Sequence, residues 1–316
     1  MSTDPSVSVI IPVFRGELTL PRLLMSIRAQ RPPCDELIIL ETDPTPEIAA
    51  LARSAGAQYV EIDGGSFDHA GTRSAAARRA SGDILVFLTQ DVILRDESTL
   101  TNLVGSLWNN IEVGAAYGRQ IPDEGADPVA AVKRLFNYPD HSHTKSAADR
   151  TRLGLRTPFI SNAFAAYRRS ALEEIGWFGR RELICEDFRA GAVLLSNGWR
   201  IRYEAEAVVH HTHHFSFGAE FRRYFDIGVA HHRHRWILDR FGSSDREGLR
   251  YLGVGLDHLK RRGRWLEIPD FLLRGLTGRM AYLLGRNHGR IPRSWRRSLS
   301  SFPEWWDRPD VDQRRP

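Results

Sequence analysis

Two carboxylates in the sequence follow apolar runs, at positions where a metal ion and a nucleotide could be bound. Asp91 comes shortly after Ile84–Leu88, a run of five apolar residues. A carboxylate there can reach a divalent cation held by a diphosphate, because hard cations take oxygen ligands. Glu41 ends a second run, Glu36–Leu40, and could accept hydrogen bonds from a nucleobase or a ribose. Taken alone, Asp91 would more simply be a helix N-cap or a loop aspartate, and only the motifs described below favour the functional interpretation.

An acidic pair lies in the second half of the chain, where Glu186 and Asp187 precede the helical pattern of Phe188–Leu195. A carboxylate that is deprotonated near pH 7 could take the proton of an acceptor hydroxyl group, which is general-base catalysis. The structural alternative is that both residues occupy the first turn of a helix, where the helix dipole stabilises acidic groups. The neighbouring Cys185 is interpreted as a small core residue rather than a nucleophile.

The segment Phe67–Arg73 combines an acidic residue, a histidine, a glycine and an arginine just before a helix rich in small residues. Gly71 permits close approach of the backbone, and the guanidinium group of Arg73 suits a phosphate or a nucleobase carbonyl. The start of the helix adds backbone N–H groups that favour anions. In the structural interpretation, Asp68 caps the helix and Arg73 lies on a solvated face. The residues alone leave these two interpretations evenly balanced.

Four of the five residues in His210–His214 are histidines, and they follow the short strand pattern Val208-Val209. Alternate residues of a strand share a face, so His211 and His213 can point in the same direction. Imidazole nitrogens can bind Mn²⁺ or Zn²⁺. The alternative is a solvated polar strand end, which four histidines in five residues make less favoured.

The elements that must position these groups follow one another in a β-α-β-α-β-α-β order. The expected strands are Val7–Val13, Glu36–Leu40, Gln58–Ile62 and Ile84–Leu88, and helix patterns fill the intervals between them. This order predicts an α/β fold with a mostly parallel, Rossmann-like sheet and helices on both faces. Ligands of such sheets bind at the carboxyl ends of the strands, where the polar residues above are concentrated.

The composition and the hydrophobic pattern of the chain change twice after the fourth expected strand. Residues 118–160 are rich in Asp, Pro and Arg and predict loops and a helix over the site. From about residue 216 the pattern becomes helical, aromatic and rich in arginine. We therefore expect a nucleotide-sugar-binding and catalytic domain over residues 1–215 and a helical, basic extension over residues 216–316. The segments Lys260–Arg264 and Arg293–Arg297 are compatible with an interfacial surface or with an ordinary solvated helix face.

The composition limits the partners and the compartment. The 316 residues carry a formal net charge of +5, which suits phosphate-bearing ligands or an anionic membrane surface but does not indicate nucleic acid. Two cysteines imply no disulfide framework, and the N-terminus lacks the pattern of a secretory signal. We expect a cytoplasmic protein whose contact with the inner face of the cell membrane is at most peripheral.

Several of these motifs together resemble the inverting family 2 glycosyltransferases of the GT-A fold. The resemblance covers roughly residues 7–228. It rests on the first strand Val9–Val13, on the helix and strand Thr72–Asp91, and on an acceptor half formed by Ile175–Phe178, Glu186-Asp187 and Gly198-Trp199. A narrower set resembles bacterial rhamnosyltransferases: Phe67–Arg73, Thr89–Asp91, His211–His213 and Tyr224–Gly228.

The resemblance implies a single-sugar transfer from dTDP-L-rhamnose to a saccharide or polyprenyl-diphosphate-linked acceptor, assisted by Mg²⁺ or Mn²⁺. It implies that Asp187, with Glu186, is catalytic and that Asp91, His211 and His213 bind the metal. The expected nucleotide-sugar contacts are Pro12, Glu41, Asp68, His69, Arg73, Thr89 and Gln90. Ser74 and Glu41 stand where the family usually has Asn and Asp.

Two other classes of function fit the sequence less well. A non-catalytic nucleotide-sugar or polysaccharide-binding protein could share the fold, but intact Asp91 and Asp187 argue against it. A dinucleotide-dependent oxidoreductase needs a Gly-x-Gly-x-x-Gly turn after the first strand, and that position here is Pro12–Gly16, without the pattern.

Overall fold

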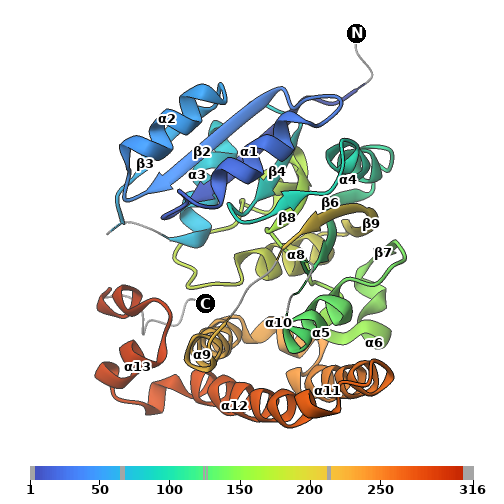
Figure 1. The fold of residues 1–316 in the computed structure, drawn as a ribbon, viewed down its shortest axis with the longest axis vertical. Helices are drawn as coiled ribbons and strands as arrows, with labels where there is room; N and C mark the ends of the chain where they lie inside the picture. Colours follow the sequence, from blue (N-terminus) through green and yellow to red (C-terminus); the bar gives the residue numbers. More distant parts are fainter. Residues whose placement is uncertain (1–3, 65–67, 124, 126, 212–214, 309–316) are drawn as a thin grey trace.

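A computed structural model describes residues 4–64, 68–123, 125, 127–211 and 215–308. It consists of a large sheet with helices packed on its faces, and of a group of helices from the last third of the chain that lies below the sheet in Figure 1. The described strands form one nine-stranded sheet in the order β3-β2-β1-β4-β8-β6-β9-β5, with β7 paired to β9. The expected α/β fold is confirmed.

The first four strands are parallel, as the β-α order predicts. They are β1 (Val7–Val13), β2 (Glu36–Thr42), β3 (Gln58–Ile62) and β4 (Ile84–Leu88), joined by α1 (Leu20–Arg28), α2 (Pro46–Ser54) and α3 (His69–Arg79). All five residues of β4 are buried, which explains why that run is apolar on both faces. The carboxyl ends of these strands meet at one edge of the sheet.

Beyond β4 the sheet becomes mixed, which the local pattern did not predict. The strand β8 (Phe164–Arg168) runs antiparallel to β4 and to β6 (Val113–Ile121), and β6 is parallel to β9 (Arg200–His210). The short strands β5 (Ile93–Leu94) and β7 (His143–Lys145) pair antiparallel with β9. The helices of this half are α4 (Thr99–Trp108), α5 (Pro128–Asn137), α6 (Arg150–Leu153), α7 (Arg169–Glu174) and α8 (Glu186–Ser196).

The sheet separates two apolar cores. Successive side chains of a strand point to opposite faces, so Ile10 belongs to one cluster while Val9 and Ile11 belong to the other. Both cores are built largely from the strands named above and from the helices that cover them. The strand ends are thereby held on a rigid base, which positions the polar residues that follow them.

The start of α2 differs from the sequence-based expectation. In the sequence, Asp43 directly before Pro44 is the expected N-cap of this helix, but Asp43 has a positive φ of 56° and lies before the helix. The N-cap is Thr45, whose hydroxyl accepts a hydrogen bond from the N–H of Ile48. Pro46 then occupies the first helical position, where a missing N–H costs nothing. The proline that decides the boundary is therefore Pro46 rather than Pro44.

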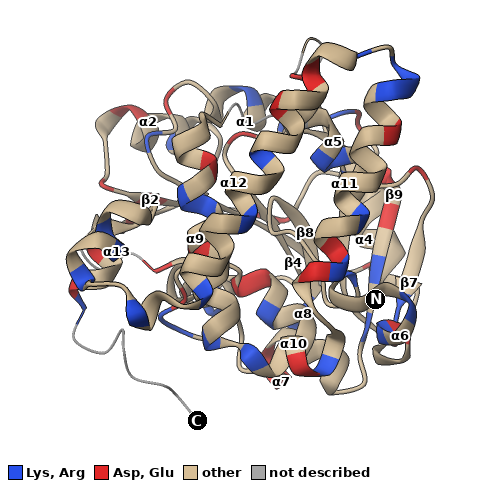
Figure 2. Cartoon of the chain, turned by 90° about the horizontal axis from the view of Figure 1, so that it is seen from below, with Lys and Arg blue, Asp and Glu red and all other residues tan. Residues whose placement is uncertain are grey.

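The last third of the described chain is helical, as the change of pattern indicated. It contains α9 (Phe217–Arg233), α10 (Arg235–Phe241), α11 (Ser244–Arg261), α12 (Ile268–Arg286) and α13 (Arg293–Leu299). Figure 2, which views the molecule from below, shows α11 and α12 lying over this side. The helices α9 and α12 pack closely because both carry glycine at the contact. A Cβ on Gly228 would lie 2.2 Å from the carbonyl oxygen of Tyr282.

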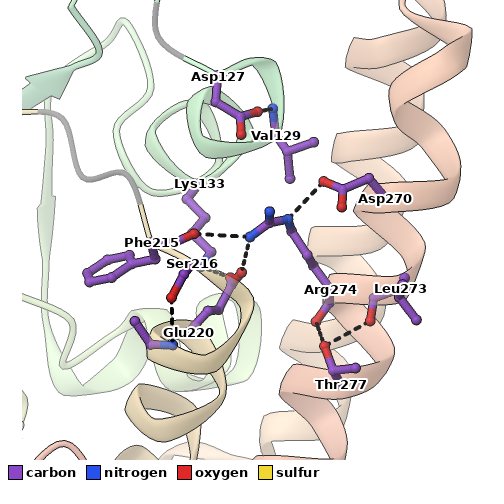
Figure 3. Close-up of polar contacts among 11 residues, drawn as sticks. Asp127, Val129, Lys133, Phe215, Ser216, Glu220, Asp270, Leu273, Arg274 and Thr277 are labelled. Atoms are coloured by element: carbon purple, nitrogen blue, oxygen red, sulfur yellow. Dashed lines mark hydrogen bonds and ion pairs between the residues drawn. The ribbon is translucent and has the colours of Figure 1, made fainter.

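A group of charged residues joins these helices to α5 (Figure 3). Arg274 of α12 donates to Glu220 of α9 over 3.0 Å and to Asp270 over 2.8 Å, and Lys133 of α5 pairs with the same Glu220. Glu220 is buried and therefore needs such partners. The contacts tie the helical region to the preceding residues, while the division into domains at residue 215 stays a prediction.

The Tyr224–Gly228 motif has a structural explanation. Asp226 is fully buried and accepts hydrogen bonds from the hydroxyl of Ser300 over 2.7 Å and from the N–H of Ser301 over 2.8 Å. It therefore fastens the segment that follows α13 to α9.

Among the described residues, none of the helices combines the length and the apolar composition that a membrane span requires.

Candidate active site

Asp91 and His211 face each other at one end of the site. Asp91 follows β4, and His211 follows β9, so two separate strands deliver them. Asp91 Oδ2 lies 3.4 Å from His211 Nε2, and the imidazole is buried. His210, the residue before His211, makes a similar but more exposed pair with Asp123, with Nδ1 lying 3.5 Å from Oδ1. The structure thus brings together two of the three expected metal ligands.

The tautomer of His211 follows from its other nitrogen. Gln120 Oε1 lies 2.8 Å from His211 Nδ1, and the same oxygen accepts a hydrogen bond from the guanidinium of Arg134. The amide nitrogen of Gln120 donates to the hydroxyl of Ser161 over 3.0 Å, which fixes the orientation of the amide. Nδ1 must therefore carry the proton. Burial chiefly, together with the positive charge of Arg134, lowers the pKa of His211, although Asp91 opposes this shift.

These contacts fit a divalent cation. In the neutral ring Nε2 carries the lone pair and lies 3.4 Å from Asp91 Oδ2, so two electron-pair donors lie close together. A hydrogen bond to Nδ1 orients a metal-binding histidine in this way in many sites. No group of three possible ligands is found among the residues described, and Mg²⁺ sites are commonly completed by substrate phosphates and water. Asp91 and His211 could thus hold a metal ion together with a bound diphosphate.

Asp187 occupies the first turn of α8 at the other end of the site. Its Oδ2 accepts the N–H of Asn162 over 3.1 Å, and its Oδ1 accepts the N–H of Phe188 over 2.7 Å. Cys185, in a left-handed conformation with a φ of 66°, turns the chain into the helix just before the pair. Burial first, and then the adjacent charge of Glu186, raise the pKa of Asp187 to about 7. A partly exposed carboxylate with such a pKa suits a general base near neutral pH.

Glu186 has a different environment from its neighbour. It is buried and lies 3.2 Å from a guanidinium nitrogen of Arg73, and Asn162 Nδ2 donates to it over 3.1 Å. Burial by itself would raise the pKa of Glu186, but the Arg73 charge brings it below its usual value. The two carboxylates therefore differ in role: Glu186 stays charged beside Arg73, while Asp187 can exchange a proton.

The backbone at Asn162-Ala163 connects the two ends of the site. The N–H of Thr89, two residues before Asp91, donates to the carbonyl of Ala163 over 3.3 Å. The N–H of Asn162 donates to Asp187, and its side chain reaches Glu186. The Asn162 side chain is held in turn by the hydroxyl of Tyr167, which donates to its oxygen over 2.8 Å. One short segment before β8 therefore spaces Asp91 from Asp187.

The Phe67–Arg73 motif anchors the loop that leads to the acidic pair. Asp68 caps α3 by accepting the N–H of Ala70 over 3.1 Å, and it also accepts the N–H groups of Arg181 and Glu182. Burial lowers the pKa of His69 to about 4, so its ring is neutral. Arg73 is buried against Glu186. These contacts support the structural interpretation of Asp68 and a positioning role for Arg73. Phe67 lies outside the described residues.

The remaining expected contacts lie along the same edge of the sheet. Glu41 is fully buried, and its two oxygens accept the hydroxyls of Thr45 over 2.9 Å and Tyr59 over 2.6 Å. Gln90 bonds both backbone groups of Phe14 and thereby joins the ends of β1 and β4. Pro12 and Thr89 are half-buried. The nucleotide contacts expected of these residues stay predictions. His213 lies outside the described residues.

Sequence reasoning missed three residues of this site: Gln120, Arg134 and Asn162. Gln120 and Asn162 act through contacts with residues distant in the chain, so no local pattern could reveal them. Arg134 belongs to the site through Gln120, whose side-chain oxygen accepts its hydrogen bond.

Comparison with known proteins identifies the family. The family model described as Glycosyl transferase family 2 matches residues 8–176, which is more than half of the chain. The chain belongs to glycosyl transferase family 2. A second model, Glycosyl transferase family group 2, matches residues 96–285. The protein is therefore a glycosyltransferase, and the expected enzyme class is confirmed.

This glycosyltransferase has close relatives among proteins of known role. The O-antigen chain rhamnosyltransferase RfbN of Salmonella typhimurium strain LT2 is 36% identical over 303 residues, which are 95% of this chain and 96% of the relative. The O-antigen chain rhamnosyltransferase WbaN of Salmonella anatum is 34% identical over 305 residues, or 96% of each chain. The similarity thus extends through the helical last third.

A solved structure supports the GT-A fold of this glycosyltransferase. The mannosyltransferase PcManGT of Pyrobaculum calidifontis, determined in complex with GDP-Man and Mn²⁺, aligns with a TM-score of 0.56. The alignment covers 86% of each chain at 19% sequence identity. At that identity the similarity concerns the fold.

The unequal environments of the acidic pair give a pH-dependent prediction. If Asp187 must be deprotonated to act, turnover rises with pH through its raised pKa of about 7. Glu186→Gln removes the neighbouring negative charge that raises the pKa of Asp187. The positive charge of Arg73, which lowers this pKa, stays in place, so Asp187 is ionised at a lower pH in the variant. The acidic limb of the kcat profile should then move down by about one pH unit or more. An unchanged limb in a pH-rate series would show that Asp187 does not set it.

Proposed function

We propose that this enzyme transfers L-rhamnose from dTDP-L-rhamnose to a saccharide carried on a lipid diphosphate, during synthesis of a bacterial surface polysaccharide. The proposal is supported by 36% and 34% identity, over nearly the whole chain, to two proteins named O-antigen chain rhamnosyltransferases. A lipid-linked acceptor would place the reaction at the inner face of the cell membrane. The observation that carries the chemistry is that Asp91 Oδ2 and His211 Nε2 lie 3.4 Å apart, while Asp187 on a separate element accepts a hydrogen bond from the N–H of Asn162.

In the proposed reaction the acceptor hydroxyl attacks the anomeric carbon while Asp187 takes its proton. The new glycosidic bond forms as the bond from the anomeric carbon to the diphosphate oxygen breaks, and the nucleoside diphosphate leaves. A divalent ion on Asp91 and His211 would supply positive charge for that departing group. The link through Asn162-Ala163 keeps Asp187 at a fixed spacing from Asp91.

The donor can be tested by competition. With dTDP-rhamnose, UDP-glucose and GDP-mannose supplied together in the presence of Mn²⁺, we expect dTDP-rhamnose to be the donor consumed and rhamnose to be the sugar transferred. Thermal unfolding with each nucleotide sugar provides a second measurement, because a ligand that binds only the folded state raises its stability. A clear preference for another donor would refute the rhamnose assignment and leave the glycosyltransferase assignment intact.

A further inference from the structure

The outer face of α12 is apolar and faces solvent. Leu272, Leu273, Leu276, Met280, Leu283 and Leu284 are all exposed, and Leu276 has 60% of its surface accessible. On a helical projection these residues fall within one continuous arc, with Arg279 at its edge and no acidic residue inside it. The opposite face carries Gly278 and Gly285 and packs on α9. A contiguous exposed apolar surface of this kind marks an interaction site.

Tryptophans and basic residues flank this apolar face at both ends. Trp265 and Leu266 lie exposed at the turn before α12, with Leu266 93% accessible, and Trp295 lies exposed in α13 beyond its other end. Residues 260–297 contain eleven Lys or Arg and two Asp or Glu. Figure 2 views this surface from outside and shows basic positions near both ends of α12. Tryptophan is enriched where an apolar phase meets water, and basic residues are attracted to anionic headgroups.

We infer that the outer face of α12 docks on an anionic lipid bilayer, with its leucines inserted at the level of the headgroups and acyl chains. An interfacial helix has this combination of an apolar face, basic flanks and aromatic ends. The charge favours lipid over a second copy of this chain, because two surfaces with the same excess of positive charge would repel each other. The inference rests on the proposed function only in that a lipid-linked acceptor would lie on the same side.

Not all of the basic residues expected to meet the membrane are available to do so. Arg296 is buried and donates to the carbonyl of Ile291 over 2.7 Å, Arg293 donates to the carbonyl of Trp306 over 2.8 Å, and Arg297 pairs with Asp307. These arginines hold the segment after α13 in place. Lys260 and Arg262 are exposed beside the Trp265 end of the apolar face, so they are better placed to meet headgroups.

The test is flotation of the full-length protein with vesicles, without donor or acceptor. Wild-type protein should float with phosphatidylcholine vesicles that contain phosphatidylglycerol and should be released by high salt. Leu276→Gln/Leu283→Gln should weaken binding on the order of 100-fold, because two leucines are no longer buried in lipid. Lys260→Glu/Arg262→Glu should weaken it ~30-fold or more. Leu18→Gln/Ile111→Gln, which changes two even more exposed apolar residues of the sheet-bearing part, should bind like wild type.

Three results would overturn the inference. Wild-type protein could fail to float with the anionic vesicles, the control pair could lose binding as strongly as the α12 pair, or purely neutral vesicles could bind equally well. Sedimentation velocity distinguishes the alternative occupant: a dimer that Leu276→Gln/Leu283→Gln converts to monomer, without vesicle binding by wild type, would make this face a protein interface. Because no donor is present, these results are independent of the donor competition.

Discussion

Replacing Asp187 by asparagine should lower kcat by ~100-fold or more while leaving the affinity for the nucleotide-sugar donor close to that of wild type. An amide cannot take up the proton of the acceptor hydroxyl. It also cannot accept from both backbone N–H groups that now bond the two carboxylate oxygens, those of Asn162 and Phe188. The measurements are steady-state turnover and, separately, donor binding by calorimetry.

Asp96→Asn is the matched control for this substitution. Asp96 also accepts hydrogen bonds before a helix, from the N–H of Ser98 and the hydroxyl of Thr99, but it lies outside the site. Its substitution should leave kcat unchanged. If Asp187→Asn turned over donor at nearly the wild-type rate, Asp187 would be removed from the mechanism. A loss of donor affinity equal to the loss of turnover would indicate a disrupted fold rather than a lost base.

Replacing Asp91 by alanine should abolish the strengthening of donor binding by Mn²⁺ and lower kcat by ~100-fold or more. The variant would leave His211 as the one remaining ligand among the described residues at this end, and a single imidazole cannot hold the ion against water. The fold should survive, because Asp91 is partly exposed at a strand end rather than part of either apolar core. Calorimetry of donor binding with and without Mn²⁺ gives the result directly.

The neighbouring Asp123–His210 pair supplies the control. It has the same residue types at a similar separation of 3.5 Å but is more exposed. Asp123→Ala should therefore retain the metal dependence of donor binding. If Asp91→Ala bound donor and Mn²⁺ as wild type does, or if Asp123→Ala lost the metal effect instead, the ion would have to be held elsewhere.

The local sequence pattern predicted what is encoded locally. The strands β1, β2 and β4 were foreseen because each is a short, mainly apolar run, and β3 because Tyr59-Val60 follows a helix pattern at the same spacing. Asp91 and Glu41 were foreseen as strand-end groups for the same reason. The start of α2 was misjudged because two prolines, Pro44 and Pro46, both offer a first helical position, and only the observed backbone distinguishes them.

What escaped prediction depends on contacts between distant parts of the chain. The antiparallel insertion of β8 between β4 and β6 is not visible in the period of any one strand. Arg73 was equally compatible with phosphate or solvent, and its partner Glu186 is more than a hundred residues away. Gln120 and Asn162 matter only because β9 and α8 bring His211 and Asp187 to them.

The measurement that tests the central claim most directly is the anomeric configuration of the product, determined by NMR of the newly formed glycosidic bond. A single displacement, in which Asp187 deprotonates the acceptor as the diphosphate leaves from the opposite side, predicts a configuration inverted relative to the donor. Retention of the donor configuration would require a second displacement through a covalent intermediate or another route. That result would contradict the assignment of Asp187 as a general base.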